Sequence, residues 1–306
     1  AVYAAVPHHL HQEFYRATVE SGKHLMGEKP FGIDRQANRA ILDSVRAHPE
    51  CFVRCASQFI FFSGMQGIGR LIEQESIGKI IEVNVGFLHS SDLNTSKPVN
   101  WKRRIATNGE YGSMGDLGMH ACLLPIRAGW RPRRVFAVQS NIVPERPDGQ
   151  GGTAACETWD NAVVSCEAEC QNSGGRFPMT LRTHRIAPGE KNSLYVEILG
   201  TRTSVRWSTK RINTIEILEY NGGEQAWQQI DLGHETAFQS ITGGIFEMGF
   251  SDAILQMWAS YIQEMTTGQL PNRFAGCATP EETAVSHELF TAAIQSQRED
   301  RTMEIH

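Results

Sequence analysis

Residues 1–34, AVYAAVPHHLHQEFYRATVESGKHLMGEKPFGID, decide the fold class of this chain. An apolar run from Val2 to Val6 predicts a strand that Pro7 ends. Apolar residues then recur at helical spacing across residues 10–22, and residues 23–27 form a second short apolar run. A strand, a helix and a strand in this order are typical of the βαβ unit of a parallel sheet.

The same alternation continues as far as residue 78. Asp34 is a candidate N-cap for a helix over residues 35–48, and it is followed by a third strand over 51–57 and a helix over 64–78. We therefore expect residues 1–78 to form part of a doubly wound (Rossmann) α/β domain whose helices cover a parallel sheet.

The pattern changes after residue 78. Residues 79–89 alternate between apolar and polar side chains, as a strand with one buried face does, and two helices are predicted at 250–268 and 279–299. Residues 79–306 are therefore expected to form an α+β domain with a large, mostly antiparallel, open sheet. Its further strands are predicted over residues 134–143, 161–170, 177–186, 193–200, 203–209, 214–220 and 226–232.

The composition is that of a globular protein, with 41% hydrophobic and 21% charged residues, and 306 residues favour two domains. The formal net charge of −5 argues against nucleic-acid and anionic-membrane partners, which require a basic surface. No apolar run reaches the ~20 residues that span a bilayer. No signal peptide is visible, so a cytoplasmic location is expected. The seven scattered cysteines fit free thiols better than disulfides or a zinc site.

Several motifs resemble those of the glucose–fructose oxidoreductase/inositol dehydrogenase (Gfo/Idh/MocA) family. VPHHLHQEF and SGKHLMGEKPFGID follow the family's strand, T-P-x-x-x-H, helix, G-K-H-V and E-K-P in order and spacing. YGSMGDLGMH at 111–120 resembles the family's G-G-x-L-x-D-x-G-x-H, and ESIGKIIEVNV and LYVEILGTRTSVRW resemble segments of its large sheet. The resemblance covers nearly the whole chain, and it implies a dehydrogenase that uses NAD or NADP.

Lys29 lies between Glu28 and Pro30, directly after the second predicted strand. Ligands of a parallel sheet bind outside the carboxyl ends of its strands, and Pro30 restricts the backbone of Lys29. An ammonium group held there can stabilise the alkoxide that develops as hydride leaves a carbinol carbon. Taken alone, the tripeptide would be a solvated turn; the flanking motifs favour a catalytic lysine.

Asp116 and His120 are four residues apart, on one face of a predicted helix. A histidine can accept a hydroxyl proton near neutral pH, and a nearby carboxylate can orient the histidine and the sugar. A histidine that only packs against its neighbours is the alternative. The resemblance implies that Lys29, Asp116 and His120 are the catalytic set.

The resemblance also implies the remaining contacts. Trp101 and Lys102 match a family W-R segment and would line the substrate pocket with Lys29, Asp116 and His120, although Trp101 is equally compatible with an ordinary surface aromatic. The run HHLH at 8–11 has no acidic or cysteine partner at a matching spacing, so no metal site is expected. The predicted cofactor-binding residues are Pro7, His8, His11, Glu28, Lys29 and Pro30.

The sequence also departs from the family pattern. Leu123 occupies the place of an aspartate found in many polyol-acting members, and Ile60 that of a common arginine. No G-x-G-x-x-G occurs, and the sequence begins without a methionine in a strand-like run. We therefore expect that a phosphate-binding part of the domain precedes Ala1 in the natural protein.

The predicted function is hydride transfer between a nicotinamide cofactor and a sugar, inositol or related polyol, in a homo-dimer or homo-tetramer formed through the large sheet. A binding or oligomeric scaffold that does not use the cofactor is one alternative. A lyase or glycoside-cleaving enzyme that recycles its NAD is another.

Overall fold

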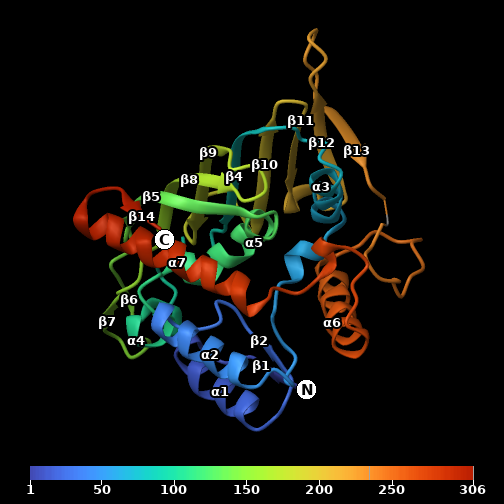
Figure 1. The fold of residues 1–306 in the computed structure, drawn as a ribbon. Coiled ribbons are helices and arrows are strands. Elements are labelled where there is room, and N and C mark those ends of the chain that lie inside the picture. The colour runs from blue at the N-terminus through green and yellow to red at the C-terminus, as the bar shows by residue number, and fades with distance from the viewer. Residues whose placement is uncertain (234, 306) are drawn as a thin grey trace.

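The computed structural model describes residues 1–233 and 235–305, and it places a small parallel sheet below a much larger sheet (Figure 1). The small sheet holds three parallel strands in the order β1 (Val2–Ala4), β2 (Leu25–Gly27) and β3 (Val53–Cys55). Helices α1 (His11–Glu20) and α2 (Arg35–Ala47) connect them. This βαβ arrangement confirms the α/β part of the predicted fold, although β1 ends two residues earlier than expected.

Local sequence signals explain where α2 begins. The side chain of Asp34 accepts a hydrogen bond from the backbone N–H of Ala37 at 2.8 Å, so the predicted N-cap is present. The helix then buries Ala37, Ile41 and Leu42 on one face. This cap fixes the chain direction shortly after the Glu28–Pro30 segment.

The large sheet has nine strands in the order β13-β12-β11-β10-β4-β9-β8-β5-β14. β4 and β9 run parallel, whereas the other neighbouring pairs are antiparallel, which confirms the predicted mostly antiparallel sheet. The strands are β4 (Ile80–Leu88), β5 (Trp130–Ser140), β8 (Asn161–Cys170), β9 (Arg176–His184), β10 (Ser193–Gly200), β11 (Thr203–Ser208), β12 (Thr214–Glu219), β13 (Gln228–Asp231) and β14 (Met303–Glu304).

Helices cover one face of this sheet. α5 (Met119–Arg127) and α7 (Pro280–Glu299) pack against β5 (Figure 1). α7 also contacts α2, so it connects the large sheet to a helix of the small parallel-sheet unit. α3 (Ser63–Glu73) packs against β11 and β12 near one end of the sheet. The predicted division at residue 78 falls between α3 and β4, and it stays a prediction.

Apart from short helical turns such as α4 (Ile105–Asn108), three pieces of structure among the described residues were not anticipated from the sequence. β6 (Glu145–Pro147) and β7 (Thr153–Ala155) form a small separate hairpin, and β14 adds a two-residue edge to the large sheet. The third piece is a π-helix over Met114–Gly118, which lies directly before α5.

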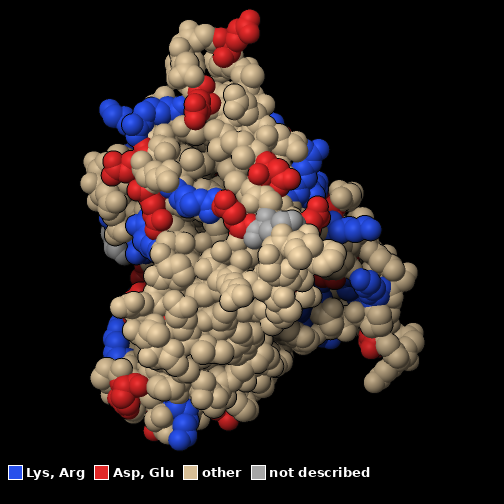
Figure 2. Space-filling model, turned by 90° about the vertical axis from the view of Figure 1, so that its right-hand side faces the viewer, with Lys and Arg blue, Asp and Glu red and all other residues tan. Residues whose placement is uncertain are grey.

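Two surfaces carry exposed apolar side chains. On the uncovered face of the large sheet these are Phe136, Val138 and Val163. The side that carries α6 (Phe250–Thr267) shows a broad area with few charged groups in its lower half (Figure 2), and Leu255 and Ile262 are exposed on that helix. Among the helices of residues 1–233 and 235–305, none is long and apolar enough to cross a membrane.

Candidate active site

The fold brings Lys29 and Asp116 together, although 87 residues separate them in sequence. Lys29 follows β2 at its carboxyl end, as predicted, and its Nζ lies 2.8 Å from Asp116 Oδ1. The same ammonium also donates to the main-chain carbonyl of Asp116 at 2.8 Å. Two bonds to one residue fix the ammonium over the start of the helical segment that carries His120.

That segment differs from the single α-helix expected from the sequence. Residues Met114–Gly118 wind as a π-helix and only Met119–Arg127 form the α-helix α5. π-turns of this kind occur mostly as short insertions at functional sites. Every residue from Tyr111 to His120 is buried, so the turn sits inside the protein rather than at a surface helix end.

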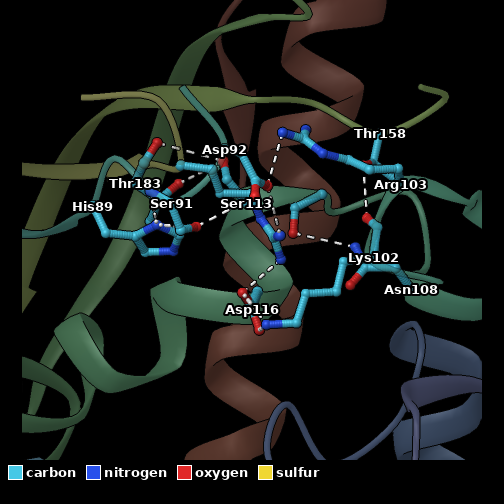
Figure 3. A network of polar contacts seen from close by, with 12 residues as sticks. His89, Ser91, Asp92, Lys102, Arg103, Asn108, Ser113, Asp116, Thr158 and Thr183 are labelled. Atoms are coloured by element: carbon cyan, nitrogen blue, oxygen red, sulfur yellow. Dashed lines mark hydrogen bonds and ion pairs between the residues drawn. The ribbon is translucent and has the colours of Figure 1, made fainter. Parts of the chain in front are cut away.

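Asp116 is surrounded by three cations. Besides Lys29, Lys102 Nζ lies 3.1 Å from Asp116 Oδ2 and Arg185 Nη2 lies 2.5 Å from the same oxygen. Burial alone would raise the pKa of the Asp116 carboxyl, but Arg185, Lys29 and Lys102 hold it well below its usual range. The carboxylate is therefore ionised, and the positive charge around it exceeds its own negative charge. Figure 3 shows Lys102 and Asp116 facing one another within a larger polar network.

His120 lies in a drier part of the site. Its side chain is buried, and its ring meets Phe59 and Phe87 edge-on at centroid distances of 4.9 and 5.9 Å. Burial and the nearby charge of Lys29 lower the pKa of His120 to about 3. No hydrogen bond to this ring is formed by the residues that the structure describes, Asp116 included. The imidazole is therefore neutral at physiological pH, with a lone pair available to accept a proton, and it does not titrate near neutrality as the sequence led us to expect.

His8 and His11 occupy different environments. His11 is fully buried, with Nε2 donating to the Val6 carbonyl at 3.0 Å and Nδ1 accepting from the Gly32 N–H at 3.2 Å. Both of its ring nitrogens are used inside the protein, so it supports the turn after Lys29. His8 donates through Nδ1 to the Asn108 carbonyl at 2.9 Å and meets the ring of Trp101 edge-on at 5.1 Å.

The other predicted contacts lie around Lys29. Glu28 accepts a hydrogen bond from the Tyr3 hydroxyl at 2.7 Å, and Pro7 is half-buried at the end of the first strand segment. Pro30 is buried, and its carbonyl accepts from Nε2 of His287 at 2.8 Å. His287 belongs to α7, so the C-terminal helix holds the residue that follows the lysine. Sequence reasoning did not identify His287.

A buried ionic network behind Asp116 was also missed. Arg185 Nη1 lies 3.4 Å from Asp92 Oδ2, and Arg103 joins Asp92 to Asp160 at 2.8 and 2.5 Å. Figure 3 shows Asp92 and Arg103 in this network beside Asp116. These residues are scattered over about ninety positions of sequence, and only strand pairing unites them, since β8 and β9 pair Asn161 with His184. No motif marks them.

A metal ion has no evident ligand set here. Across residues 1–233 and 235–305, no three His, Cys, Asp or Glu side chains lie close enough to hold one. The run HHLH does not converge, because the ring nitrogens of His11 bind backbone groups. That the protein uses no metal stays a prediction.

Comparison with known proteins identifies a family model that matches the middle of the chain. Residues 65–206 match the family model of the GFO/IDH/MocA C-terminal domain. This segment is a Gfo/Idh/MocA C-terminal domain. The match confirms the resemblance read from the motifs within this segment, which include YGSMGDLGMH at 111–120.

The chain is similar to two curated proteins over larger or comparable parts of its length. Levoglucosan dehydrogenase of Pseudarthrobacter phenanthrenivorans is 25% identical over 229 residues, which cover 70% of this chain and 56% of that protein. An uncharacterized oxidoreductase of Synechocystis is 28% identical over 149 residues, which cover 48% of this chain and 39% of that protein. The chain thus spans about half the length, or less, of these relatives.

Solved structures share the fold at low sequence identity. Levoglucosan dehydrogenase in complex with NADH and L-sorbose superposes with a TM-score of 0.86 at 19% identity, covering 100% of this chain and 79% of that one. An inositol dehydrogenase homolog from Azotobacter vinelandii in complex with NAD+ gives 0.81 at 16% identity, covering 99% and 77%. These likenesses show that the chain shares the fold of those two structures.

Proposed function

We propose that this protein is an NAD-dependent dehydrogenase that oxidises a CH–OH group of a sugar, inositol or related polyol. The observation that carries the proposal is the juxtaposition of the Lys29 ammonium with the ionised Asp116 carboxylate at the carboxyl end of β2, next to the neutral His120. Relatives named for levoglucosan and inositol oxidation support a polyhydroxylated substrate.

The residues present fit a nicotinamide cofactor at this strand end. Glu28 and Pro7 lie half-buried beside Lys29, and the Glu28 carboxylate is held in place by Tyr3. Carboxylates and backbone groups at the carboxyl ends of parallel strands are suited to hydrogen-bond a carboxamide and a ribose. Pro7, His8, Glu28 and Lys29 would face the cofactor, whereas His11 and Pro30 would support it from behind.

The chain's own residues would divide the reaction between them. Lys29 would donate a hydrogen bond to the reacting hydroxyl oxygen and stabilise the negative charge that develops there. His120 would take the hydroxyl proton on a ring nitrogen, and its low pKa means that this proton then passes readily to solvent. NAD, when bound, would accept the hydride from the carbinol carbon. The substrate is thereby oxidised to a ketone or aldehyde.

Asp116 and Lys102 would serve the substrate. Asp116 fixes the Lys29 ammonium through two of its oxygens, and Lys102 is one-third exposed, at 35% of its side chain, so it reaches the open side of the site. Trp101 is 37% exposed and meets the His8 ring edge-on, which suits a wall between the cofactor and substrate positions.

We also propose that a second copy of the chain covers the open face of the large sheet. Phe136, Val138 and Val163 are exposed there by 39, 56 and 40%. Exposed apolar side chains on a sheet face are commonly buried by oligomerisation. Sedimentation velocity should show a dimer or tetramer for the wild-type protein. V138E, which places a charge on this face, should sediment as a smaller species.

The activity is tested on the full-length protein with NAD and NADP and a panel of sugars and inositols. We expect NADH to form in equal amount to the oxidised product, and Lys29→Met to lower kcat by ~10² or more because the alkoxide loses its cation. Lys23→Met, which replaces an exposed lysine near the same strand, is the control.

Other outcomes would contradict the proposal. Product without net NADH would indicate a redox-assisted cleavage instead. Absence of nicotinamide binding by calorimetry would favour the scaffold, and unchanged turnover in the Lys29 variant would remove this residue from the mechanism.

A further inference from the structure

The ionic network behind Asp116 has a defined centre in Arg185, the residue directly after β9. Its side chain is 2% exposed, and its two terminal nitrogens contact different carboxylates, Asp116 Oδ2 at 2.5 Å and Asp92 Oδ2 at 3.4 Å. We propose that Arg185 is a positioning residue of the reaction, one that holds the Asp116 carboxylate in the orientation from which it aligns the Lys29 ammonium. The proposal rests on the proposed dehydrogenase function and adds a residue to it.

The two oxygens of Asp116 have separate tasks. Oδ1 accepts from Lys29 and Oδ2 accepts from Arg185, whereas Lys102 donates to both oxygens, at 3.2 and 3.1 Å. Rotation of the carboxylate about its Cβ–Cγ bond would break both sets of contacts together. An anchor on Oδ2 therefore determines where Oδ1 points, and with it the position of the lysine.

Arg185 is the better anchor of the two cations on Oδ2. The Lys102 side chain is 35% exposed, whereas Arg185 is enclosed and presents a rigid planar guanidinium that suits a carboxylate. Charge-assisted hydrogen bonds inside a protein are also stronger than those that face water.

Arg185 is itself fixed from behind. Asp92 is shared between Arg185 and Arg103, and Arg103 is fully buried with its other arm on Asp160. Arg146, from the β6 segment, donates to the main-chain carbonyls of Asp92 and Asn94 and so holds the loop that carries Asp92. The chain of contacts thus runs from Lys29 to the small hairpin through the buried side chains of Asp116, Arg185 and Asp92.

The experiment compares kcat, KM and the pH profile of kcat/KM in the wild-type protein, Arg185→Met, Arg185→Lys and Arg182→Met. Arg182 is the matched control because it lies on β9, three residues before Arg185, and is exposed. We expect R185M to lower kcat about 10- to 100-fold while the KM for NAD changes less than about twofold, the range for one lost charge-assisted bond. R185K should recover part of the loss, and R182M should match the wild type.

The pH profile separates positioning from general loss of stability. The ionisable groups around Asp116 are Lys29, Lys102 and Arg185, with Asp92, His8, His89 and His120 beyond them. Without Arg185, the Asp116 carboxyl loses one of the three cations that lower its pKa. Protonation of Asp116 should then add an acid limb to the R185M profile that is absent from the wild type. A purely structural arginine would reduce the amount of folded enzyme without adding this limb.

Crystal structures of R185M and R182M provide a readout that does not need activity. Lys29 Nζ should stay 2.8 Å from Asp116 in R182M and separate from it in R185M. If the wild type forms no NADH, the proposed function fails, while this distance still decides the positioning role. An R185M enzyme with wild-type kcat, an unchanged pH profile and an intact lysine–carboxylate pair would overturn the proposal. Should R185M not fold, R185K and Asp92→Asn carry the same tests.

Discussion

At the scale of single residues, the site depends on mutual electrostatics between a cation and a base. Burial first, and then the charge of Lys29, keeps His120 neutral, because an imidazolium is unfavourable in a dry cavity and more so near an ammonium. The same ammonium needs a partner to stay buried, and Asp116 supplies it. The three proposed roles are therefore physically linked, since a change in one side chain alters the protonation of the others.

The protonation state of His120 leads to a prediction about pH. Because the pKa of His120 is lowered to about 3, the base is already deprotonated throughout pH 5–8, so kcat/KM should show no acid limb from this residue in that range. His120→Asn should lower kcat/KM by ~10²–10⁴ at every pH in the window. A wild-type limb near pH 6.5 that disappears in H120N would show that this histidine titrates as an ordinary one.

At the scale of elements, close helix-to-sheet packing depends on glycine at one position of α3. A Cβ atom added to Gly64 would lie 2.0 Å from the ring of Trp207 on β11, far inside contact distance. Phe62, just before the helix, packs on the same indole at 5.9 Å between centroids. The ring is therefore enclosed and has little room to move away.

We expect Gly64→Ala to destabilise the protein despite the higher helix propensity of alanine. Forcing a methyl group into a filled core costs typically ~1–3 kcal/mol, which outweighs the gain of up to ~1 kcal/mol from replacing a helical glycine. Urea unfolding followed by tryptophan fluorescence measures the difference. Gly223→Ala is the control, because nothing lies within 4 Å of its added Cβ; equal stabilities for the two variants would contradict the packing argument.

Elements with a strong periodic pattern were predictable, and those held by distant contacts were not. The strand Asn161–Cys170 was predicted to the residue, since its alternation is set by a sheet with one buried face. The hairpin β6–β7 has no such face, and it sits against the loop near Asp92 through Arg146. The π-turn at Met114–Gly118 likewise has no signature, because glycine and apolar residues there fit an α-helix equally well.

At the scale of the whole molecule, several histidines are buried in their neutral form. Burial lowers the pKa of His8, His11 and His120 to about 3 and that of His287 to about 4. In the unfolded chain they would titrate near the ordinary value of about 6.5. Between these values the unfolded state binds more protons than the folded state, so stability falls as pH drops below about 6.5.

This difference predicts acid-sensitive folding. The urea midpoint should be constant from pH 8 to 7 and should decrease steadily from pH 6.5 to 4.5. In His287→Gln the slope of unfolding free energy against pH should decrease by up to ~1.4 kcal/mol per pH unit, because one proton-binding group is lost. His9→Gln, which changes an exposed histidine beside the buried His8, should keep the wild-type slope. Identical slopes in all three proteins would show that buried histidines do not govern the acid limit.

The site as a whole was only partly predictable. Lys29, Asp116 and His120 follow from motifs and strand ends, and the structure brings Lys29 and Asp116 into contact. Arg185 and Asp92 reach the site through sheet pairing between segments far apart in sequence, and single charged residues at strand ends occur throughout such sheets. A ligand site assembled by register is visible only once the register is known.

The π-turn at Met114–Gly118 also determines the direction in which the side chains of α5 point. In a regular helix each residue advances the side-chain direction by about 100°, so an added or removed residue turns everything downstream by that angle. A chain with one residue deleted from this turn would keep α5 as a helix and could still pack α7 over it. His120 would then point away from Lys29 while Asp116 kept its cations. A one-residue deletion in this segment should therefore abolish activity even though every catalytic side chain is still present, because α5 is rotated about its axis.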